Sequence, residues 1–442
     1  MSRRRKKLPP DPIEATIESL SHEGRGIAHV DGKTIFIDGA LAGETVMFRY
    51  ARRRSRYAEG FVETVVQASA RRIEAKCPHY ELCGGCSLQH MQPTDQIEHK
   101  GKVLLEQLQH IANVEPESIL APLTGPVWGY RRKARLGVKY VFKKDRVLVG
   151  FREKRSGYIA DIQRCDVLHP KVGESLEELQ QLISKLSIYD QIPQIEVAVG
   201  SDTTALVLRH LRELSEQDKQ TLHDFQQTSG LSIYLQASGP GSVVPLDATT
   251  NTKLSYRLGK YDIENHFLPT DFTQVNFDIN ESMIEQVIAL LSPEPADNIL
   301  DLFCGLGNFT LVLAKFSAKV TGVEGAQDLV DRAKQNAKYN NIKNVDYHAL
   351  DLMKDNLDKQ YLHGGYNKIL LDPPRSGAQE IINQLNLKQI EKIVYVSCNP
   401  ATLARDAGIL VNEKGFKLKQ AGVMDMFPHT AHVESIALFE RK

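Results

Sequence analysis

The sequence predicts a multidomain protein of the α/β and β classes, with a small N-terminal β-barrel, a central α+β domain and a C-terminal doubly wound α/β domain. Its 442 residues are enough for about three domains. Short strands of alternating polarity fill residues 1–68, whereas helices alternate with apolar strands over residues 272–442. The composition, 42% hydrophobic and 25% charged, argues against disorder, collagen or a coiled coil as the main architecture.

No stretch of the sequence is suited to entering a membrane. There is no run of about 18 uncharged apolar residues. The basic segment 1–7 leads directly into Leu8-Pro-Pro and not into an apolar segment, which argues against a signal peptide. We therefore expect a soluble, cytoplasmic and monomeric protein that has no membrane partner.

The balance of 55 basic and 55 acidic residues hides two basic regions. Residues 131–155 hold eleven Lys or Arg against two acidic residues, and residues 1–75 hold fourteen against ten. Any single charged run is compatible with a solvated face. Two separate basic blocks in a neutral protein favour a polyanionic partner such as a nucleic acid.

Residues 1–68 have the pattern of a small β-barrel. Apolar and polar residues alternate over 13–20, 33–38, 43–50 and 58–66. Between the last two strands, five arginines are interleaved with Tyr50 and Tyr57. Guanidinium and aromatic planes together suit phosphate contact and base stacking, so this hairpin is a candidate RNA contact, although a merely charged hairpin tip is the alternative. The arginines are Arg49, Arg52, Arg53, Arg54 and Arg56.

Residues 69–271 form the predicted central α+β domain, which begins with a group of cysteines. Three of them lie close together around Gly84-Gly85, which permits a tight turn, and a fourth follows far downstream. Zinc and an iron–sulfur cluster both accept four cysteine ligands, and the spacing does not choose between them. The helical spacing of apolar residues over about 95–112 predicts a helix that packs on the C-terminal domain. The four cysteines are Cys77, Cys83, Cys86 and Cys165.

A glycine-bearing turn begins the C-terminal domain, 272–442, after a predicted strand at 298–303. Gly305 and Gly307 allow the backbone to approach a ligand, and Glu324 ends the next predicted strand, where it can bind ribose hydroxyls. Thr310 stands where a dinucleotide site has its third glycine. A nucleoside without pyrophosphate therefore fits better than NAD, and S-adenosylmethionine is the obvious candidate. A merely tight turn is the alternative.

Three further residues carry candidate chemistry at ends of predicted strands. Asp372, in the stiff Leu-Asp-Pro-Pro-Arg segment 371–375, is placed to hydrogen-bond a planar heterocycle, with a surface Asp-Pro turn as the alternative. Cys398 follows the strand 392–396 and is either a structural cysteine or a nucleophile that needs a nearby positive field or base. Glu434 interrupts an apolar run, which is the setting of a carboxylate with a raised pKa that acts as a base.

The motifs together resemble the RNA uracil-C5 methyltransferases, in particular those that act on large-subunit (23S) rRNA. The resemblance covers nearly the whole chain and rests on FTQVN, DLFCGLGNF, LDPPR, SCNP and HVE, at 272–276, 301–309, 371–375, 397–400 and 432–434. Residues 11–68 resemble a TRAM domain, an OB-like barrel. The cysteine region resembles the [4Fe–4S] site of that family, and 272–442 resembles its Rossmann-like class I S-adenosylmethionine-dependent domain.

The resemblance implies a role for each motif residue. Cys398 adds to C6 of the uracil, Asp372 binds the uracil edge, and Glu434 removes the C5 proton after methyl transfer. Phe272 is a stacking surface for an extruded base, and the basic residues Arg131, Arg132 and Lys133 join the arginine hairpin as RNA contacts. The four cysteines hold the cluster. The methyl donor and the base are bound by Gln274, Phe303, Gly305, Asn308, Glu324, Asp351 and Asp372.

Other functions remain open at this point. An iron–sulfur redox enzyme uses the four cysteines but gives Cys398 and the glycine turn no role. A non-catalytic iron–sulfur RNA-binding or assembly protein uses only the barrel and the basic blocks. Within the resembling family, a different uridine of rRNA or of tRNA is the alternative substrate.

Overall fold

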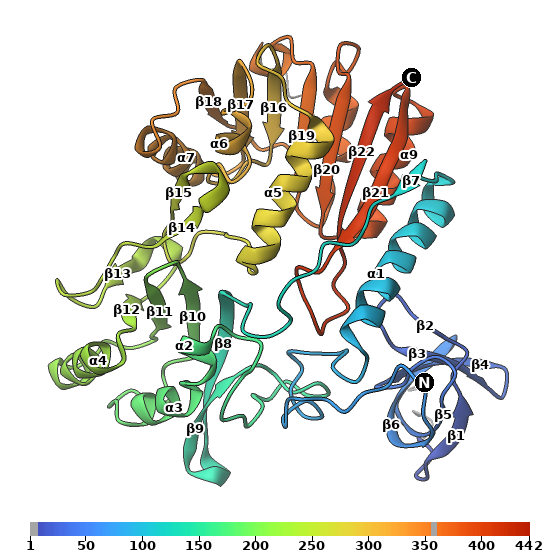
Figure 1. The fold of residues 1–442 in the computed structure, drawn as a ribbon. Helices are drawn as coiled ribbons and strands as arrows, with labels where there is room; N and C mark the ends of the chain where they lie inside the picture. The colour runs from blue at the N-terminus through green and yellow to red at the C-terminus, as the bar shows by residue number, and fades with distance from the viewer. Residues whose placement is uncertain (1–7, 355–359) are drawn as a thin grey trace, which may run out of the picture.

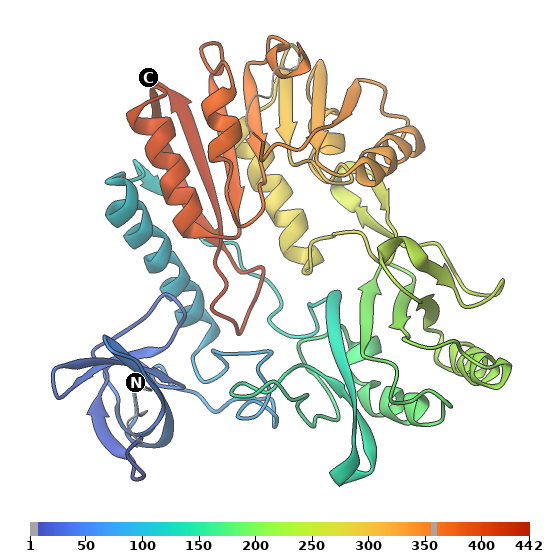
Figure 2. The same cartoon turned by 180° about the vertical axis from the view of Figure 1, so that it is seen from behind.

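The computed structural model describes residues 8–354 and 360–442, so the basic segment 1–7 lies outside the described residues. The chain forms three parts (Figures 1 and 2). In the view of Figure 1 a large sheet with its helices lies at the top, a second sheet lies at the lower left, and a small barrel lies at the lower right. No helix among the described residues is long and apolar enough to span a membrane.

The N-terminal part is a six-stranded barrel-like sheet in the order β1-β5-β6-β4-β3-β2. Alternating residues such as Ile35, Ile37, Val46 and Phe48 are fully buried inside it, as the alternation of the sequence requires. The amide of Glu18 donates to the carbonyl of Ile27 at 2.8 Å and joins the ends of the sheet. The strands are β1 (Ile13–Thr16), β2 (Ser19–Leu20), β3 (Gly26–Val30), β4 (Lys33–Asp38), β5 (Thr45–Arg53) and β6 (Tyr57–Gln67).

A long helix connects this barrel to the large sheet. Helix α1 (Pro93–Gln107) ends in one π-helical turn, Leu108–Ala112. Its buried face, which includes Val103 and Leu104, belongs to the same hydrophobic core as Leu410 and Val423 of the C-terminal part. The short strand β7 (Ser118–Ile119) then pairs with the edge of the large sheet. Residues 93–119 are therefore packed on the C-terminal domain.

The central part is a six-stranded sheet in the order β13-β12-β11-β10-β8-β9, covered by helices on one side (Figure 1). Its core joins Ile195, Val197 and Leu206 of the sheet to Leu179 and Ile183 of a helix. The strands are β8 (Lys133–Val141), β9 (Arg146–Gly150), β10 (Gln194–Val199), β11 (Thr204–Arg209), β12 (Ser232–Gln236) and β13 (Val243–Pro245), and the helices are α2 (Pro170–Gly173), α3 (Leu176–Ser184) and α4 (Glu216–Ser229).

A hairpin joins the central part to the large sheet. It consists of β14 (Ser255–Leu258) and β15 (Ile263–His266). Its buried residues, among them Tyr256 and Ile263, share one hydrophobic core with α5 and the first strand of the large sheet. The domain limits expected at 68 and 271 stay predictions.

The C-terminal sheet has eight strands in the order β18-β17-β16-β19-β20-β22-β21-β7. The strands from β18 to β20 are parallel, whereas β22 runs antiparallel between β20 and β21. The strands are β16 (Asn298–Leu302), β17 (Lys319–Glu324), β18 (Val345–Ala349), β19 (Lys368–Leu371), β20 (Lys392–Ser397), β21 (Phe416–Met424) and β22 (Glu434–Arg441).

Helices cover both faces of this sheet, which explains the nearly continuous apolar strands. Leu370 and Val394 face the core that contains α5, whereas Ile369 and Ile393 face the core that contains α1, α8 and α9. Because the chain reverses its strand order at β16 and β19, their carboxyl ends border the crevice where such folds bind ligands. The helices are α5 (Phe277–Leu291), α6 (Thr310–Leu313), α7 (Gln327–Tyr339), α8 (Gln379–Gln384) and α9 (Pro400–Asn412).

Candidate active site

The glycine turn after β16 has the backbone geometry that its sequence predicts. Phe303, Gly305 and Gly307 all have positive φ values, of 65°, 56° and 96°. A Cβ atom at Gly307 would stand 2.7 Å from the hydroxyl of Tyr347, so a larger residue does not fit there. This turn brings the backbone close to the crevice at the carboxyl ends of the strands.

Glu324, the last residue of β17, lies beside this turn. One of its carboxylate oxygens accepts a hydrogen bond from the Gly305 amide at 3.0 Å, and the other accepts one from the Ala326 amide at 3.2 Å. The two bonds fix the carboxylate at the edge of the cavity. Its remaining lone pairs are available to a diol.

Asn308 lines the same cavity, but its amide group is bound to protein atoms. Its Oδ1 accepts from the Tyr256 hydroxyl at 2.8 Å and from Asn280 Nδ2 at 3.1 Å, and its Nδ2 donates to Asn280 Oδ1 at 2.8 Å. This residue therefore connects α5, the hairpin β14–β15 and the glycine turn. Its side chain therefore supports the wall of the cavity, and its polar atoms are already hydrogen-bonded to protein.

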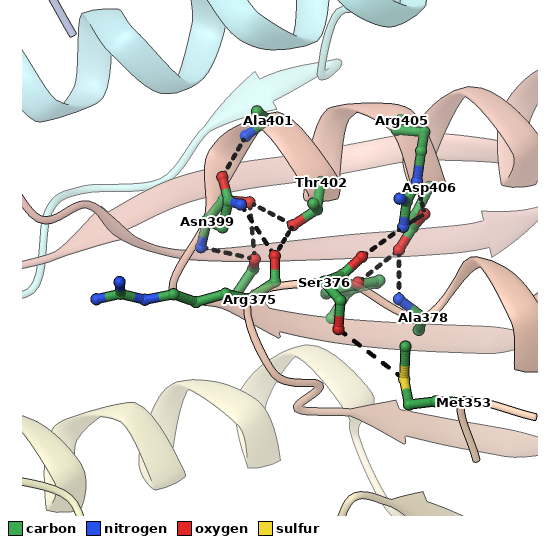
Figure 3. A network of polar contacts seen from close by, with 11 residues as sticks. Met353, Arg375, Ser376, Ala378, Asn399, Ala401, Thr402, Arg405 and Asp406 are labelled. Atoms are coloured by element: carbon green, nitrogen blue, oxygen red, sulfur yellow. Dashed lines mark hydrogen bonds and ion pairs between the residues drawn. The ribbon is translucent and has the colours of Figure 1, made fainter.

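The loop that carries Asp372 is held by the start of α9. The Arg375 carbonyl accepts from Asn399 Nδ2 at 2.9 Å and from the Thr402 hydroxyl at 3.3 Å. The buried Asp406 carboxylate accepts from the Ala378 amide at 2.7 Å. Figure 3 shows this network and shows the Arg375 guanidinium extending away from it. The loop after β19 and the loop after β20 are thus one connected unit.

Cys398 directly follows β20 and Glu434 is the first residue of β22, so both lie at the same end of two neighbouring strands. In the antiparallel pairing of β20 with β22, Ser397 stands across from Ser435, so the same register places Cys398 across from Glu434. Cys398 also lies one residue before Asn399, the N-cap of α9. The positive end of a helix favours a thiolate at that place.

Burial gives the acidic groups of this site unusual pKa values. Burial and the carboxylates of Glu434 and Asp372 raise the pKa of the Cys398 thiol to about 11. Burial and the charge of Asp372 raise the pKa of Glu434, which is 5% exposed, to about 8. Burial and Glu324 raise the pKa of Asp372 to about 7. Cys398 and Glu434 therefore hold their protons near neutral pH, and a positively charged ligand would lower these pKa values.

These residues line one cavity of about 610 Å³, a volume within the usual range for small-molecule sites. Every residue predicted for the methyl donor and for the reaction lines it, and so does the 69% exposed Phe272. The predicted set in the cavity wall is Phe272, Gln274, Phe303, Gly305, Asn308, Glu324, Asp351, Asp372, Cys398 and Glu434.

Sequence reasoning missed several residues of the wall. Tyr256 comes from the hairpin assigned to the central domain, and Phe427 comes from a loop between two motifs. A lone aromatic residue in a loop has no periodicity that reveals it. Arg375 and His432 also line the cavity, and both belong to motifs that the sequence already singles out.

The four predicted metal ligands are brought together. Cys77, Cys83, Cys86 and Cys165 line one small cavity, which Tyr80 and Arg131 also border. Burial raises the pKa of Cys86 to about 12 and of Cys165 to about 11, and the charges of the other cysteines act in the same direction. In residues 8–354 and 360–442, no three His, Cys, Asp or Glu side chains form a group placed to hold a metal ion.

The predicted RNA contacts divide into two groups. The arginine hairpin lies on β5 and its turn, where Arg52, Arg53, Arg54 and Arg56 are exposed, while Arg49 pairs with Glu63 at 2.8 Å. The second group is bound to protein atoms. Arg132 donates to the Gly200 carbonyl at 3.0 Å, Arg131 to the Lys133 carbonyl at 3.1 Å, and Lys133 to the Pro269 carbonyl at 2.6 Å.

The fold and this cavity define a class I S-adenosylmethionine-dependent methyltransferase: parallel strands with one antiparallel insertion, a glycine turn after the first strand and an acidic residue ending the second. The chain matches the tRNA (uracil-5-)-methyltransferase family over residues 93–442 and the TRAM domain over residues 11–62. It belongs to this family of RNA uracil-C5 methyltransferases.

The chain is similar over its full length to two curated relatives. It is 52% identical to the 23S rRNA (uracil(1939)-C(5))-methyltransferase RlmD of Alkalilimnicola ehrlichii, with 100% of this chain and 99% of the relative covered. It is 53% identical to the RlmD of Hahella chejuensis, with 100% of both covered. Among solved structures, the tRNA (uracil-54, C5)-methyltransferase of Pyrococcus abyssi in complex with S-adenosyl-L-homocysteine shares the fold. The TM-score is 0.73 at 24% identity, and the match covers 97% of this chain and 100% of that one.

Proposed function

We propose that this protein forms 5-methyluridine at one uridine of 23S rRNA, with S-adenosylmethionine as the methyl donor. The observation that carries the proposal is the placement of Cys398 across from Glu434 in the wall of a cavity whose other side holds the glycine turn and Glu324. A nucleophile, a base and a nucleoside site are thereby combined. The full-length relatives named for uridine 1939 support this nucleotide as the target.

The residues present fit the methyl donor. Glu324 offers oriented oxygens for ribose hydroxyls, and the glycine turn lets the ligand approach the backbone. When bound, S-adenosylmethionine supplies a methyl group on a positively charged sulfur. The carboxyls of Asp372 and Glu434 suit that charge. We assign Gln274, Phe303 and Asp351 to the same ligand because they line the same cavity.

Cys398 supplies the nucleophile that activates the uracil. After the thiol has released its proton to water, its thiolate forms a bond to C6, and the electron pair of the C5–C6 double bond moves toward C4 and its oxygen. C5 then becomes nucleophilic and forms a bond to the methyl carbon, while the carbon–sulfur bond breaks, its electron pair stays on the sulfur and S-adenosylhomocysteine leaves. Asp372, with its pKa near 7, holds a proton that it can share with the uracil edge as this charge develops.

Glu434 supplies the base that completes the reaction. As a carboxylate it takes the proton from the methylated C5, the electron pair restores the C5–C6 double bond, and the bond to Cys398 breaks with the thiolate as leaving group. A pKa near 8 makes Glu434 a stronger base than an ordinary carboxylate. Its position across from Cys398 suits a group that acts on the same ring as the nucleophile.

The RNA has to present its target base unstacked, because a paired base does not enter such a cavity. Phe272 is exposed at the cavity and is the proposed stacking surface for the extruded base. A groove between the barrel, the cysteine loop and the β8–β9 pair has a volume of about 600 Å³, and its lining includes Arg25, Arg135 and Arg152 as well as Glu23, Asp38 and Glu153. We propose that this groove and the arginine hairpin bind phosphates of the same RNA, and that the protein acts as a monomer.

We propose that the four cysteines bind a [4Fe–4S] cluster, with a structural or RNA-positioning role. Their thiolates raise one another's pKa, and bound iron would remove this repulsion. Four thiols around one shared cavity also suit ligands that bind four different irons. Protein purified without oxygen should be brown and contain about four irons and four sulfides per chain. A colourless protein with one zinc would contradict this assignment.

The methylation assay that tests the function uses 23S rRNA from cells that lack the enzyme. We expect one new 5-methyluridine, mapped by mass spectrometry of nuclease fragments, and none with the Cys398→Ala variant. Methylation of tRNA but not of 23S rRNA would show that the substrate is a tRNA, as for the tRNA-specific members of the family. Methylation by the Cys398→Ala variant would refute the proposed nucleophile.

A further inference from the structure

Residues 425–433 form the loop between β21 and β22, which ends directly before Glu434, the candidate base. We refer to this loop as the strap. Phe427 and His432 of the strap line the active-site cavity, and Glu434 follows it directly. Their rings lie against each other, with centroids 5.4 Å apart. In Figure 1 the strap is the red loop that extends below the large sheet toward the segment before α1.

The first anchor of the strap is a buried ion pair with α1. Lys100 Nζ stands 2.7 Å from Asp425 Oδ1 and donates to the Phe427 carbonyl at 3.0 Å. The two side chains are only 1% and 3% exposed. A buried ion pair adds little stability compared with a well-packed apolar pair, so such a pair is better explained by the geometry that it imposes.

The second anchor consists of hydrogen bonds to both the amide and the carbonyl of His429, in the middle of the strap. The His429 amide donates to Gln96 Oε1 at 2.8 Å. The His429 carbonyl accepts from the amides of Ser87 and Leu88, at 2.9 and 3.0 Å. His429 has a φ of 65°, a left-handed conformation that a residue with a side chain keeps only when its surroundings impose it.

Gln96 is fully buried and connects this anchor to the cysteine loop. Its Nε2 donates to the carbonyls of Leu88 and Met91, both at 2.9 Å. Leu88 follows Cys86 by two residues. The same glutamine therefore binds the end of the cysteine loop through Nε2 and the strap through Oε1, and its Nε2 also lies 3.2 Å from His429 Nδ1.

Two more contacts come from the segment before the central sheet. The ring of Trp128 lies 4.1 Å from that of His429, and the Tyr130 hydroxyl donates to the Pro428 carbonyl at 3.0 Å. Each of these anchors of the strap thus comes from residues 87–130, which precede the central sheet in the chain. The Rossmann-like fold supplies the strands on either side of the strap, while these contacts fix the loop itself.

We propose that Gln96 and Lys100 are positioning residues for the reaction, because they fix the strap so that Glu434 meets C5 of the bound uracil. Gln96 and the amides of Ser87 and Leu88 thereby link the cysteine loop to the strap that directly precedes Glu434. This proposal rests on the proposed function. It gives the cysteine loop a second role beside its own ligand, namely to hold the catalytic strap.

Because Glu434 acts after methyl transfer in the proposed reaction, the proposal predicts an effect on one kinetic step only. A displaced strap should leave formation of the Cys398 adduct within about twofold of the wild type and slow its resolution by roughly tenfold or more. Binding of the methyl donor should not change, because the glycine turn and Glu324 lie on other strands. A general loss of structure would slow both steps and weaken binding.

The experiment compares Gln96→Leu and Lys100→Met with the wild type and with Lys102→Met, an exposed lysine on the same helix that pairs with Glu98. Labelled methyl donor and denaturing gels give the formation and decay of the protein–RNA adduct, and hydrogen exchange gives the protection of amides 426–433. We expect slower decay and faster exchange in the first two variants only. The double variant Lys100→Met/Asp425→Asn, which leaves no buried charge unpaired, keeps the test valid if Lys100→Met fails to fold.

Equal adduct decay and equal exchange in the Gln96 variant and the wild type would overturn the proposal. Proportional loss of formation, decay and donor binding would also overturn it, since that pattern is merely structural. If the wild type methylates RNA without any Cys398 adduct, the proposed covalent mechanism fails instead, and the exchange data still decide whether Gln96 and Lys100 fix the strap.

Discussion

The proposed reaction uses two side chains, Cys398 and Glu434, that both hold protons near neutral pH. The charge of Glu434 helps to raise the pKa of Cys398, whereas burial and the charge of Asp372 raise the pKa of Glu434. The sequence predicts both residues from their motifs, but it does not predict their coupling. That coupling arises because the antiparallel register of β20 and β22 brings together positions 36 residues apart in the chain.

The thiol should titrate at lower pH when its acidic neighbour loses its charge. In the Glu434→Gln variant we expect the pKa of Cys398 to fall below the value of about 11 that burial and the two carboxylates produce. The pH dependence of alkylation by iodoacetamide, followed by mass spectrometry at Cys398, measures it. Lys102→Met, a change at an exposed lysine, keeps both carboxylates and serves as control. An unchanged or higher midpoint would show that Glu434 does not act on the thiol.

The raised pKa of Glu434 also predicts how stability depends on pH. Because the folded state binds this proton more tightly than the unfolded state, its stabilising effect is complete below pH 4.5 and is lost as pH rises through about 8. Glu434→Gln should therefore gain stability relative to the wild type between pH 5 and pH 9, on the order of a few kcal/mol. Urea unfolding of both proteins at pH 5 and pH 9 measures this gain in stability. If the variant shows no gain, the Glu434 carboxylate lies in solvent.

At the scale of elements, the strands of the C-terminal sheet are predictable because they are apolar on both faces and follow turn residues. The strand expected at 298–303 is the observed β16, Asn298–Leu302, and the strand expected at 392–396 is the observed β20, Lys392–Ser397. Helix α6, Thr310–Leu313, is short because the glycine turn occupies the residues before it. Strand β3 has no expected counterpart, since glycine and histidine weaken its pattern.

The start of α9 should be essential to the loop that carries Asp372. Asp406 accepts from the Ala378 amide and from the Tyr395 hydroxyl, both at 2.7 Å, in the buried network of Figure 3. Asp406→Ala leaves these donors without a partner and should cost about 2–4 kcal/mol of stability and reduce turnover. Urea unfolding and methylation rates measure both effects, with exposed Asp331→Asn as control. A loss below about 0.5 kcal/mol would contradict the role of the network.

At the scale of the whole molecule, long-range packing was the least predictable feature. The sequence places helix 95–112 against the C-terminal domain, but it gives no sign that Gln96 and Lys100 reach the strap about 330 residues away. The sequence also identifies the four cysteines as one set of ligands, but it does not indicate the groove between the barrel and the cysteine loop. These contacts depend on how three separately patterned parts assemble.

The arginine hairpin should contribute affinity and salt dependence but no chemistry, because none of its residues lines the active-site cavity. Replacing Arg52, Arg53 and Arg54 by alanine should weaken rRNA binding and flatten the plot of log K against log salt by up to about 0.7 per lost phosphate contact. Replacing Lys185, Lys219 and Lys253 of the central domain is the matched control. An unchanged slope would show that the barrel does not touch the RNA.

If Cys398 and Glu434 act at opposite ends of one covalent reaction, the Glu434→Gln variant should separate the two steps. With labelled methyl donor and rRNA, this variant should accumulate methylated RNA bonded to Cys398, seen as a labelled protein–RNA band on a denaturing gel. The same variant with Cys398→Ala should give no band. Normal turnover by Glu434→Gln, or loss of activity without a trapped adduct, would contradict the account and make His432 the next base to test.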